Sequence, residues 1–139
     1  TLVGTVDFLP TLLEMLGLAD GSAELRQGKS ILPALRGKNK EEVNEYVYGG
    51  SLYRAVDNEF FSGESVVEMI RNKEWKLIKE TIYAEKSGEK ISETYELYKV
   101  SEDSKEKYNV YEKEPAIARD LLKKLGAWSQ ATGREQSPE

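Results

Sequence analysis

The spacing of three strand-like segments in the middle of the chain constrains the fold more than any other feature. Residues 65–71 and 74–82 are rich in β-branched and aromatic residues and are separated by a two-residue polar turn. A third such segment, 94–100, follows a charged connection that contains Gly88. Parallel strands need a crossover of a dozen or more residues, usually a helix, and these connections are too short for one. The sequence therefore predicts antiparallel strands joined as hairpins.

A fourth strand is predicted at residues 46–48, where two tyrosines flank a valine. The pair Gly49-Gly50 is expected to end this strand after a short run. The stretch that follows, 51–63, has no clean period and is too apolar for a solvated linker. We expect a structured loop there.

Two longer segments, one at each end of the chain, have helical spacing. Over residues 5–17, four leucines recur at i, i+3, i+4 and i+7 and form one apolar stripe: Leu9, Leu12, Leu13 and Leu16. Pro10 predicts a kink or a late start in this helix, because a proline past the first turn removes a backbone donor. Apolar residues also repeat at helical spacing over 115–128, and this helix is expected to cover the sheet.

The predicted fold class is α+β: a small four-stranded antiparallel sheet packed by a C-terminal helix, with an N-terminal amphipathic helix. Between that first helix and the first strand, residues 28–38 predict one short helical turn, capped by Ser30 and ended by Gly37. Trp75 and Trp128 fall on the apolar faces of a predicted strand and helix, so core packing is expected for both. A chain of 139 residues is long enough for one globular domain with a core.

Composition argues against several classes of function. The chain has 20 Lys and Arg against 25 Asp and Glu, a net charge of -5, which disfavours nucleic-acid binding. No stretch approaches the about 20 apolar residues needed to cross a bilayer, so no membrane partner is expected. The absence of histidine and cysteine removes the usual zinc ligands and the commonest proton shuttle. Because a chain without cysteine suits oxidising and reducing compartments alike, localisation stays open.

The best candidate for ligand contact is a small cluster within residues 51–63. Tyr53, Arg54 and Asn58 combine an aromatic ring, a fixed positive charge and a carboxamide, which suits an anionic or sugar-like group. The alternative is structural, since Arg54 can pair with Asp57 and hold the loop closed.

Four strings follow one another along the chain: TVDFLPTLLEMLGL and GKSILPALRGK near the start, MIRNKEWKLIKE in the middle and YELYKVSEDSKEKYNV before the last helix. In this order they resemble the C-terminal portion of sulfatases, the formylglycine-dependent members of the alkaline phosphatase superfamily. The closing helix also matches, so the resemblance spans nearly the whole chain. The chain departs from the family pattern at Lys99, where an aspartate is usual, and at Ser104, where a D-P turn has its proline. A looser turn is expected there.

The resemblance implies that the chain is a single C-terminal subdomain, with 1–37 as the helical end of a large α/β domain and 45–130 as the sheet and terminal helix. Sulfatases hydrolyse sulfuric esters through a Cys or Ser, in a C/S-x-P-x-R motif, that is converted to formylglycine near a calcium ion. This motif is absent here, so the resemblance transfers no catalytic residue and no metal ligand. Formylglycine and calcium are expected in an upstream catalytic domain of the same chain, which is the implied partner. The subdomain is expected to form a wall of the substrate pocket, with Tyr53, Arg54 and Asn58 at its rim.

Two other hypotheses stay open. One is an autonomous interaction or oligomerisation module, and the other is the end of a phosphatase or phosphonate-ester hydrolase of the same superfamily. The chain starts at Thr1 and reaches an apolar helical pattern within five residues, which is typical of a piece of a longer chain. In the isolated chain we expect part of the leucine stripe to be exposed and to cause self-association or helix exchange, because apolar patches of several hundred Å² seldom stay bare.

Overall fold

The structure is a computed structural model, and it describes residues 1–18, 28–38, 42–58, 61–84 and 87–133 of the chain. These residues fall into two compact units, Thr1–Val47 (unit 1) and Tyr48–Glu139 (unit 2), and each is described by itself. The helices are η1 (Thr5–Asp7), α1 (Phe8–Met15), α2 (Leu32–Leu35) and α3 (Pro115–Ala131). The strands are β1 (Val47–Asn58), β2 (Phe61–Arg71), β3 (Lys76–Ala84) and β4 (Lys90–Tyr98).

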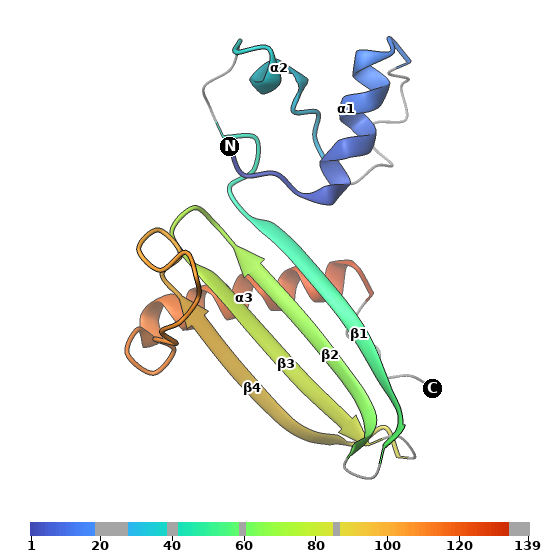
Figure 1. The fold of residues 1–139 in the computed structure, drawn as a ribbon, viewed down its shortest axis with the longest axis vertical. Helices are drawn as coiled ribbons and strands as arrows, with labels where there is room; N and C mark the ends of the chain where they lie inside the picture. Colours follow the sequence, from blue (N-terminus) through green and yellow to red (C-terminus); the bar gives the residue numbers. More distant parts are fainter. Residues whose placement is uncertain (19–27, 39–41, 59–60, 85–86, 134–139) are drawn as a thin grey trace. The chain divides into compact units, whose positions relative to one another are not determined.

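The first helix of unit 1 begins later than the leucine spacing alone predicts (Figure 1). A single 3-10 turn, η1, precedes α1, so Pro10 lies in the first turn of the α-helix. A proline there costs no helical hydrogen bond, because the first N–H groups of a helix have no partner inside it. Of the two expectations raised by Pro10, the late start is the one that the structure shows. The helix ends at Met15, and Gly17 follows with a φ of +67°.

The short helical turn predicted over 28–38 is α2. The helix begins one residue later than predicted: its N-cap is Ile31, which makes no side-chain cap, and Ser30 Oγ accepts the backbone N–H of Leu32 over 3.2 Å from just outside the turn. Gly37 follows the turn with a φ of +68°. The short turn and its end at Gly37 are as predicted, because local backbone conformation decides them, whereas the N-cap is not Ser30.

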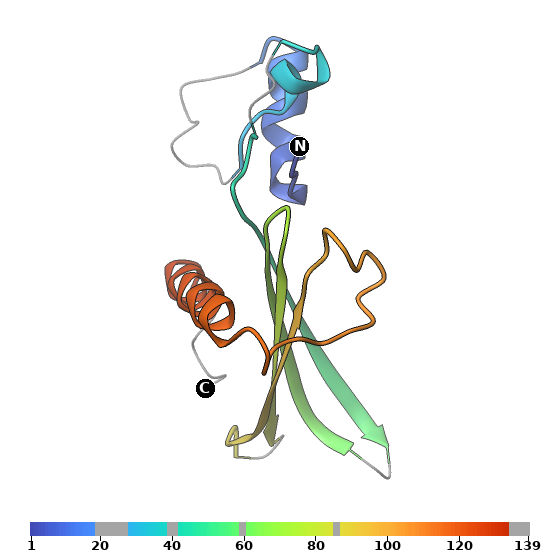
Figure 2. The same cartoon turned by 90° about the vertical axis from the view of Figure 1, so that its left-hand side faces the viewer.

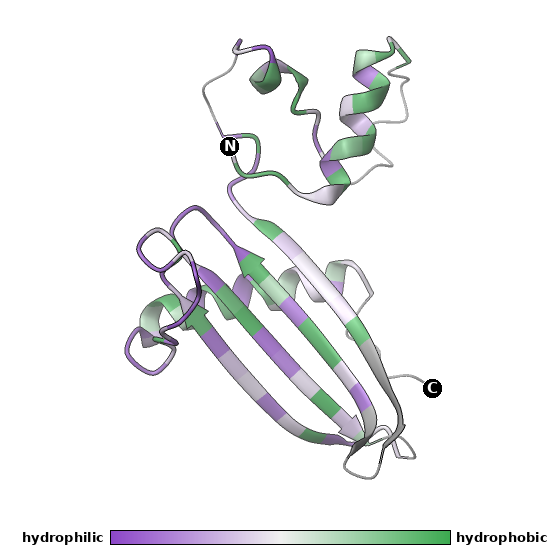
Figure 3. Ribbon diagram, in the orientation of Figure 1, coloured by the Kyte–Doolittle hydropathy of each residue, from purple (hydrophilic) through white to green (hydrophobic). Residues whose placement is uncertain are grey.

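The leucine stripe of α1 is not buried within unit 1. The side chains of Leu9, Leu12 and Leu16 are 56%, 53% and 70% exposed. Figure 3 shows hydrophobic residues along most of α1 and α2. Among the described residues of this unit, Leu32 is the large apolar residue that is buried. Unit 1 therefore has little apolar core of its own.

Gly28 in unit 1 occupies a position that only glycine tolerates. Its φ is +96°, and a Cβ atom added there would lie 2.3 Å from the carbonyl oxygen of Val6. Since the obstructing atom belongs to the backbone, no side-chain rotation relieves the clash. We predict that Gly28→Ala lowers the unfolding free energy of unit 1 by about 2–3 kcal/mol. The measurement is faster amide hydrogen exchange in peptides from 1–18 and 28–38.

Gly37 provides the matched control. It also has a positive φ, but a Cβ there meets nothing within 4 Å. Gly37→Ala should cost only the left-handed backbone penalty of about 1 kcal/mol. Equal exchange rates in the two variants would contradict the proposed clash at Gly28.

Unit 2 holds a four-stranded sheet in the order β1-β2-β3-β4 (Figure 1), which confirms the predicted antiparallel architecture. β2 pairs with β3, and β3 with β4, in antiparallel register. The short connections read from the sequence thus produce consecutive hairpins. Figure 3 shows hydrophobic and hydrophilic residues alternating along β2 and β3, as expected for strands whose two faces differ.

β1 corrects two of the sequence predictions. The strand does not end at Gly49-Gly50 but continues to Asn58, and β2 begins at Phe61, so the loop predicted over 51–63 is mostly strand. A Cβ atom at Gly49 would lie 3.1 Å from Cε of Met69. Glycine here makes room for a neighbouring side chain instead of ending the strand.

The core of unit 2 lies between the sheet and α3, which covers one face of it as predicted (Figure 2). Ile70, Leu77 and Leu97 stand opposite one another on β2, β3 and β4, and all three are fully buried. Ala118, Leu121 and Leu125 supply the buried apolar side chains of α3. Each such side chain contributes about 1.5–3 kcal/mol of transfer free energy. Residues between β4 and α3 lie beside the opposite face of the sheet (Figure 2).

The two tryptophans are half-buried, whereas the sequence predicts core packing for both. The Trp128 ring stacks on the Tyr48 ring with centroids 5.2 Å apart. The Lys99 ammonium lies 5.8 Å from the centroid of the Trp75 ring. Large amphipathic rings are rarely buried completely. Within the described ranges, no helix has the length and apolar character to span a membrane.

Candidate functional site

The residues predicted to contact substrate lie in the second half of β1. The backbone of Tyr53, Arg54 and Asn58 is part of the strand, and their side chains lie outside what the structure describes. The substrate rim and the alternative Arg54–Asp57 pair therefore both stay predictions. The structure differs from the prediction in the element that carries these residues, which is a long strand of a hairpin and not a loop.

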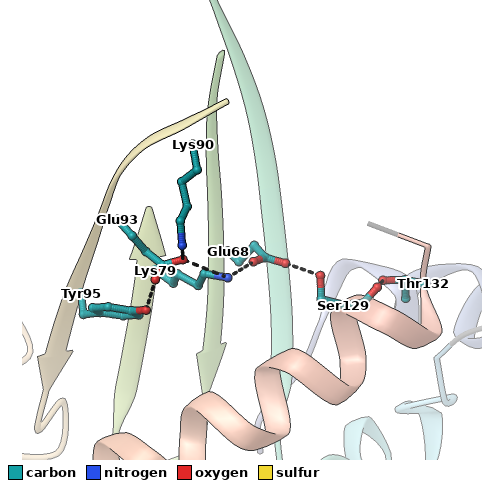
Figure 4. Close-up of polar contacts among 7 residues, drawn as sticks. All are labelled: Glu68, Lys79, Lys90, Glu93, Tyr95, Ser129 and Thr132. Atoms are coloured by element: carbon teal, nitrogen blue, oxygen red, sulfur yellow. Dashed lines mark hydrogen bonds and ion pairs between the residues drawn. The ribbon is translucent and has the colours of Figure 1, made fainter. Parts of the chain in front are cut away.

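A network of charged side chains joins the sheet to α3 (Figure 4). Its centre is Glu68 on β2, whose side chain is 8% exposed. Glu68 Oε1 accepts a hydrogen bond of 2.6 Å from the hydroxyl of Ser129 on α3. Glu68 Oε2 lies 3.5 Å from the ammonium of Lys79, its register partner on β3. One buried carboxylate thus links two strands and the helix.

The network continues to β4 through Glu93. Its Oε1 lies 3.7 Å from Lys79 Nζ and 3.6 Å from Lys90 Nζ, and its Oε2 accepts the hydroxyl of Tyr95. The bond from Tyr95, together with the two ammonium groups, lowers the pKa of Glu93. Burial, and then the bond to Glu93, raises the pKa of Tyr95 far above its usual value.

The charges of this network balance one another. Two carboxylates, Glu68 and Glu93, face two ammonium groups, Lys79 and Lys90, and both carboxylates already accept hydrogen bonds. Glu68 is the buried charge among the four, and its contacts with Lys79 and Ser129 connect β2, β3 and α3. The arrangement is suited to fixing α3 on the sheet.

The other face of the sheet carries a second tyrosine–carboxylate pair. The Tyr98 hydroxyl donates to Glu96 over 2.9 Å, and burial followed by this bond raises the pKa of Tyr98 to about 12. Lys76, the register partner of Tyr98, pairs with Glu106 over 2.6 Å. This ion pair attaches the segment after β4 to the sheet.

Residues 99–114 contain no helix or strand, yet Asp103 fixes their path. Asp103 Oδ2 accepts the backbone N–H groups of Lys107 and Tyr108 at 2.7 and 2.9 Å. Ser104 replaces the proline of the family pattern, and a looser turn is expected there. Asp103 closes this turn by its own hydrogen bonds.

Asn109 attaches the same segment to the edge of β4. Its Oδ1 accepts the backbone N–H of Leu97 at 3.0 Å, and its Nδ2 donates to the carbonyl of Tyr95 at 3.2 Å. The N–H of Val110 donates to the Leu97 carbonyl over 2.8 Å. These bonds cover the backbone groups of an edge strand that is otherwise open to pairing.

The polar centre of unit 1 is the carboxylate of Asp7, which is 1% exposed. Its Oδ2 accepts the N–H of Gly4 at 2.8 Å and Nδ2 of Asn44 at 2.7 Å. Its Oδ1 accepts the N–H of Lys29 at 2.8 Å. Asp7 therefore holds together three segments that are distant in the sequence.

Sequence reasoning missed the roles of Glu68 and Asp7. A signal for Glu68 exists, because it interrupts an apolar strand two residues before Ile70, while Ser129 follows Leu125 by four residues on the apolar stripe of α3. Polar residues on two apolar faces that meet indicate a buried pair. The only local signal for Asp7 is its place just before α1, which indicates a helix cap.

Metal-binding groups are not found in the described ranges: no three His, Cys, Asp or Glu side chains lie together in a way that could hold an ion. The sulfatase resemblance places its calcium ligands in the upstream catalytic domain, so calcium binding by the full-length protein stays a prediction.

Comparisons with known proteins identify the family. The chain matches the family described as N-sulphoglucosamine sulphohydrolase, C-terminal, over residues 1–131. Comparison with curated proteins gives no match.

Several solved structures share the fold. A Bacteroides thetaiotaomicron protein from work on the metabolism of multiple glycosaminoglycans has a TM-score of 0.61 at 15% identity, over 89% of this chain and 26% of its own. The Bacteroides fragilis protein yidJ, described as a sulfatase, has a TM-score of 0.62 at 19% identity, over 93% and 25%. A second glycosaminoglycan-metabolism protein of B. thetaiotaomicron has a TM-score of 0.55 at 21% identity, over 89% and 24%.

This chain spans about a quarter of the length of these structures. At such identities the likeness shows the fold, while the family match covers nearly all of the sequence. The resemblance noted from the four sequence strings is thereby confirmed, and the chain belongs to the N-sulphoglucosamine sulphohydrolase C-terminal family, as the C-terminal part of a sulfatase.

Proposed function

We propose that this chain is the non-catalytic part of a sulfuric ester hydrolase and supports the substrate pocket of that enzyme. The observation that carries the proposal is the family match over residues 1–131, in a chain about a quarter as long as the solved structures that share its fold. The sequence has no cysteine, no histidine and no C/S-x-P-x-R motif. We therefore assign the formylglycine nucleophile and the calcium ligands to the remainder of the full-length protein.

The proposed partner of unit 1 is the catalytic domain of the same protein, with 1–37 forming the end of that domain. Support comes from the large apolar side chains that unit 1 exposes: Val3, Val6, Phe8, Leu9, Leu12, Met15, Leu16, Leu18 and Leu35. Such a surface is rare on a free monomer and is typical of a protein interface. In the isolated chain the same surface should cause self-association.

The proposed contact with substrate is made by the β1–β2 hairpin. Tyr53, Arg54 and Asn58 offer a ring, a guanidinium and an amide on one strand. A guanidinium binds sulfate oxygens or other anionic groups of a substrate well, because its donors form a planar fork.

The test of the proposed activity uses the full-length protein. We expect it to release sulfate from an aryl sulfate and from sulfated sugars, and its sequence to contain a C/S-x-P-x-R motif outside this chain. Hydrolysis of aryl phosphate or phosphonate esters without sulfate release would favour the related hydrolases of the superfamily. The proposal would be overturned if the full-length protein hydrolysed none of these esters and its sequence contained no C/S-x-P-x-R motif.

A substitution at Arg54 tests the pocket wall. Arg54→Ala in the full-length protein should raise KM about tenfold for its sulfated substrate, since a charge-assisted contact contributes about 1.5–3 kcal/mol. Steady-state kinetics and the melting temperature Tm are measured together. Arg71→Ala, at an exposed position on β2, is the control and should leave KM unchanged. If Arg54→Ala lowered Tm and left KM unchanged, Arg54 would not contact substrate, and its role would be the structural pairing with Asp57.

A further inference from the structure

Residues 109–111, here called the edge guard, bind the edge of β4 as a further strand would. The side-chain amide of Asn109 binds the N–H of Leu97 and the carbonyl of Tyr95. The N–H of Val110 donates to the Leu97 carbonyl over 2.8 Å. In an antiparallel sheet, alternate residues of a strand direct both backbone groups to the same side. Leu97 and Tyr95 are thus the residues that face away from β3, and the edge guard binds three of their backbone groups.

A pair of stacked rings completes the likeness to a strand. The Tyr111 ring lies on the Tyr95 ring with centroids 5.0 Å apart and an interplanar angle of 5°. Aromatic pairs between neighbouring strands stabilise sheets in the same way. Asn109 Oδ1 also accepts the N–H of Tyr111 at 3.0 Å, which fixes the backbone of the edge guard. The edge guard therefore supplies both hydrogen bonds and a ring contact to β4.

Polar contacts, with little apolar burial, hold the segment that carries the edge guard. Residues 104–105 and 107–109 are exposed. The anchors of the segment include the Lys76–Glu106 ion pair of 2.6 Å and the two N–H groups bound by Asp103. Glu106 has a φ of +53°, a strained conformation for a residue other than glycine. Segments with few buried apolar contacts open at a lower free energy than the core, so the edge guard can open while the sheet stays folded.

The edge of β4 is complementary to a second copy of itself. In an antiparallel pair centred on Thr94, this residue stands opposite Thr94 of the second copy. The three charged residues of the strand then face uncharged ones: Lys90 faces Tyr98, Glu93 faces Tyr95 and Glu96 faces Ser92. No like charges stand directly opposite each other, which would destabilise the pair. Glu93 and Tyr95 have the same parity as Leu97, so their outward backbone groups meet in this register.

We propose that the edge of β4 is a latent dimerisation surface and that the edge guard keeps it from pairing with β4 of a second copy. Exposed edge strands are templates for pairing, and proteins commonly cover them. Two identical strands related by a two-fold axis form the self-complementary interface of a dimer. Asn109 decides between the closed and the open edge, because its side chain binds two of the three covered groups. The proposal concerns association alone and does not rest on the proposed enzymatic function.

The test measures the association of the full-length protein by analytical ultracentrifugation over a series of concentrations. Asn109→Ala should lower the apparent dissociation constant for pairing at least about tenfold, because the edge guard no longer has to be displaced. Asn109→Asp keeps the acceptor for Leu97 but loses the donor to Tyr95, so a smaller change in the same direction is expected. Amide hydrogen exchange in dilute samples, faster in peptides that cover 95–97, reports that the edge guard is open.

A second substitution shows whether β4 makes the contact. Thr94 is exposed and lies at the centre of the expected pair. Thr94→Lys therefore places two ammonium groups directly opposite each other in the dimer, while it leaves the single copy unaffected. Asn109→Ala combined with Thr94→Lys should associate no more than the wild type.

The matched control is Asn72→Ala. Asn72 Oδ1 accepts the N–H groups of Glu74 and Trp75 at 2.8 and 2.6 Å, so this variant also loses two backbone hydrogen bonds, in the turn between β2 and β3. It should leave association unchanged. The proposal would be overturned if Asn109→Ala associated no more than the wild type, if Asn72→Ala associated equally, or if Thr94→Lys did not reverse the association.

Discussion

Replacing Glu68 by alanine is expected to cost unit 2 about 3–5 kcal/mol of unfolding free energy. The substitution leaves the hydroxyl of Ser129 without its partner at 2.6 Å and the ammonium of Lys79 without one of its two carboxylates. A buried group that loses its partner bears the desolvation cost without compensation. Chemical denaturation followed by tryptophan fluorescence measures the effect, since Trp75 and Trp128 both belong to unit 2.

Companion variants separate charge from hydrogen bonding at Glu68. Ser129→Ala should cost about 2 kcal/mol, because it removes one hydrogen bond to a charged group. Glu68→Ala combined with Ser129→Ala should cost less than the sum of the single losses, because the two residues share that bond. Glu89→Ala, at an exposed position, should change stability by less than about 0.5 kcal/mol. If Glu68→Ala behaved like Glu89→Ala, the network would have no role in holding α3.

Replacing Asp7 by alanine is expected to have a comparable effect on unit 1, a loss of about 3–5 kcal/mol. Gly4, Lys29 and Asn44 each lose the acceptor of a hydrogen bond of 2.7 or 2.8 Å. Because unit 1 has little apolar core, these bonds make up much of what orders it. The loss is measured by amide hydrogen exchange in the full-length protein. Amides in peptides from 1–18, 28–38 and 42–47 should exchange faster in the variant than in the wild type.

Two further variants test the prediction for Asp7: one conservative substitution and one control at an exposed position. Asp7→Asn keeps the shape of the side chain but replaces one acceptor oxygen by an NH₂ group, which cannot accept a hydrogen bond. The unfolding free energy of unit 1 should therefore fall by an intermediate amount, about 1–2 kcal/mol. Glu14→Ala, on an exposed position of α1, should leave exchange unchanged. Wild-type exchange rates in Asp7→Ala would show that the buried carboxylate is dispensable.

The sheet shows where local patterns are sufficient. Residues 65–71 and 74–82 are predicted as paired strands and form most of β2 and β3, because β-branched and aromatic enrichment and a short turn are local properties. The terminal helix follows from its spacing in the same way and is α3. The loop predicted over 51–63 fails, since the packing of Met69 beside Gly49 depends on a neighbouring strand that no local window contains.

The candidate sites depend on contacts between residues that are distant in the sequence. Glu68 and Ser129 are 61 residues apart, and Asp7 and Asn44 are 37 apart. Composition and spacing place each of these residues on an element, but they do not say which elements meet. The substrate rim of Tyr53, Arg54 and Asn58 stays a prediction for the kinetics of Arg54→Ala to test.

The sequence by itself determined the family, the antiparallel hairpins and the two helical ends, because recurring strings, periodicity and turn chemistry are encoded over short stretches. Only the tertiary structure decided that β1 runs on through two glycines, that Glu68 and Asp7 are buried, and that Asn109 covers the edge of β4. Burial is a property of the surfaces that come together, and its cost or benefit appears only when a polar group meets, or lacks, its partner.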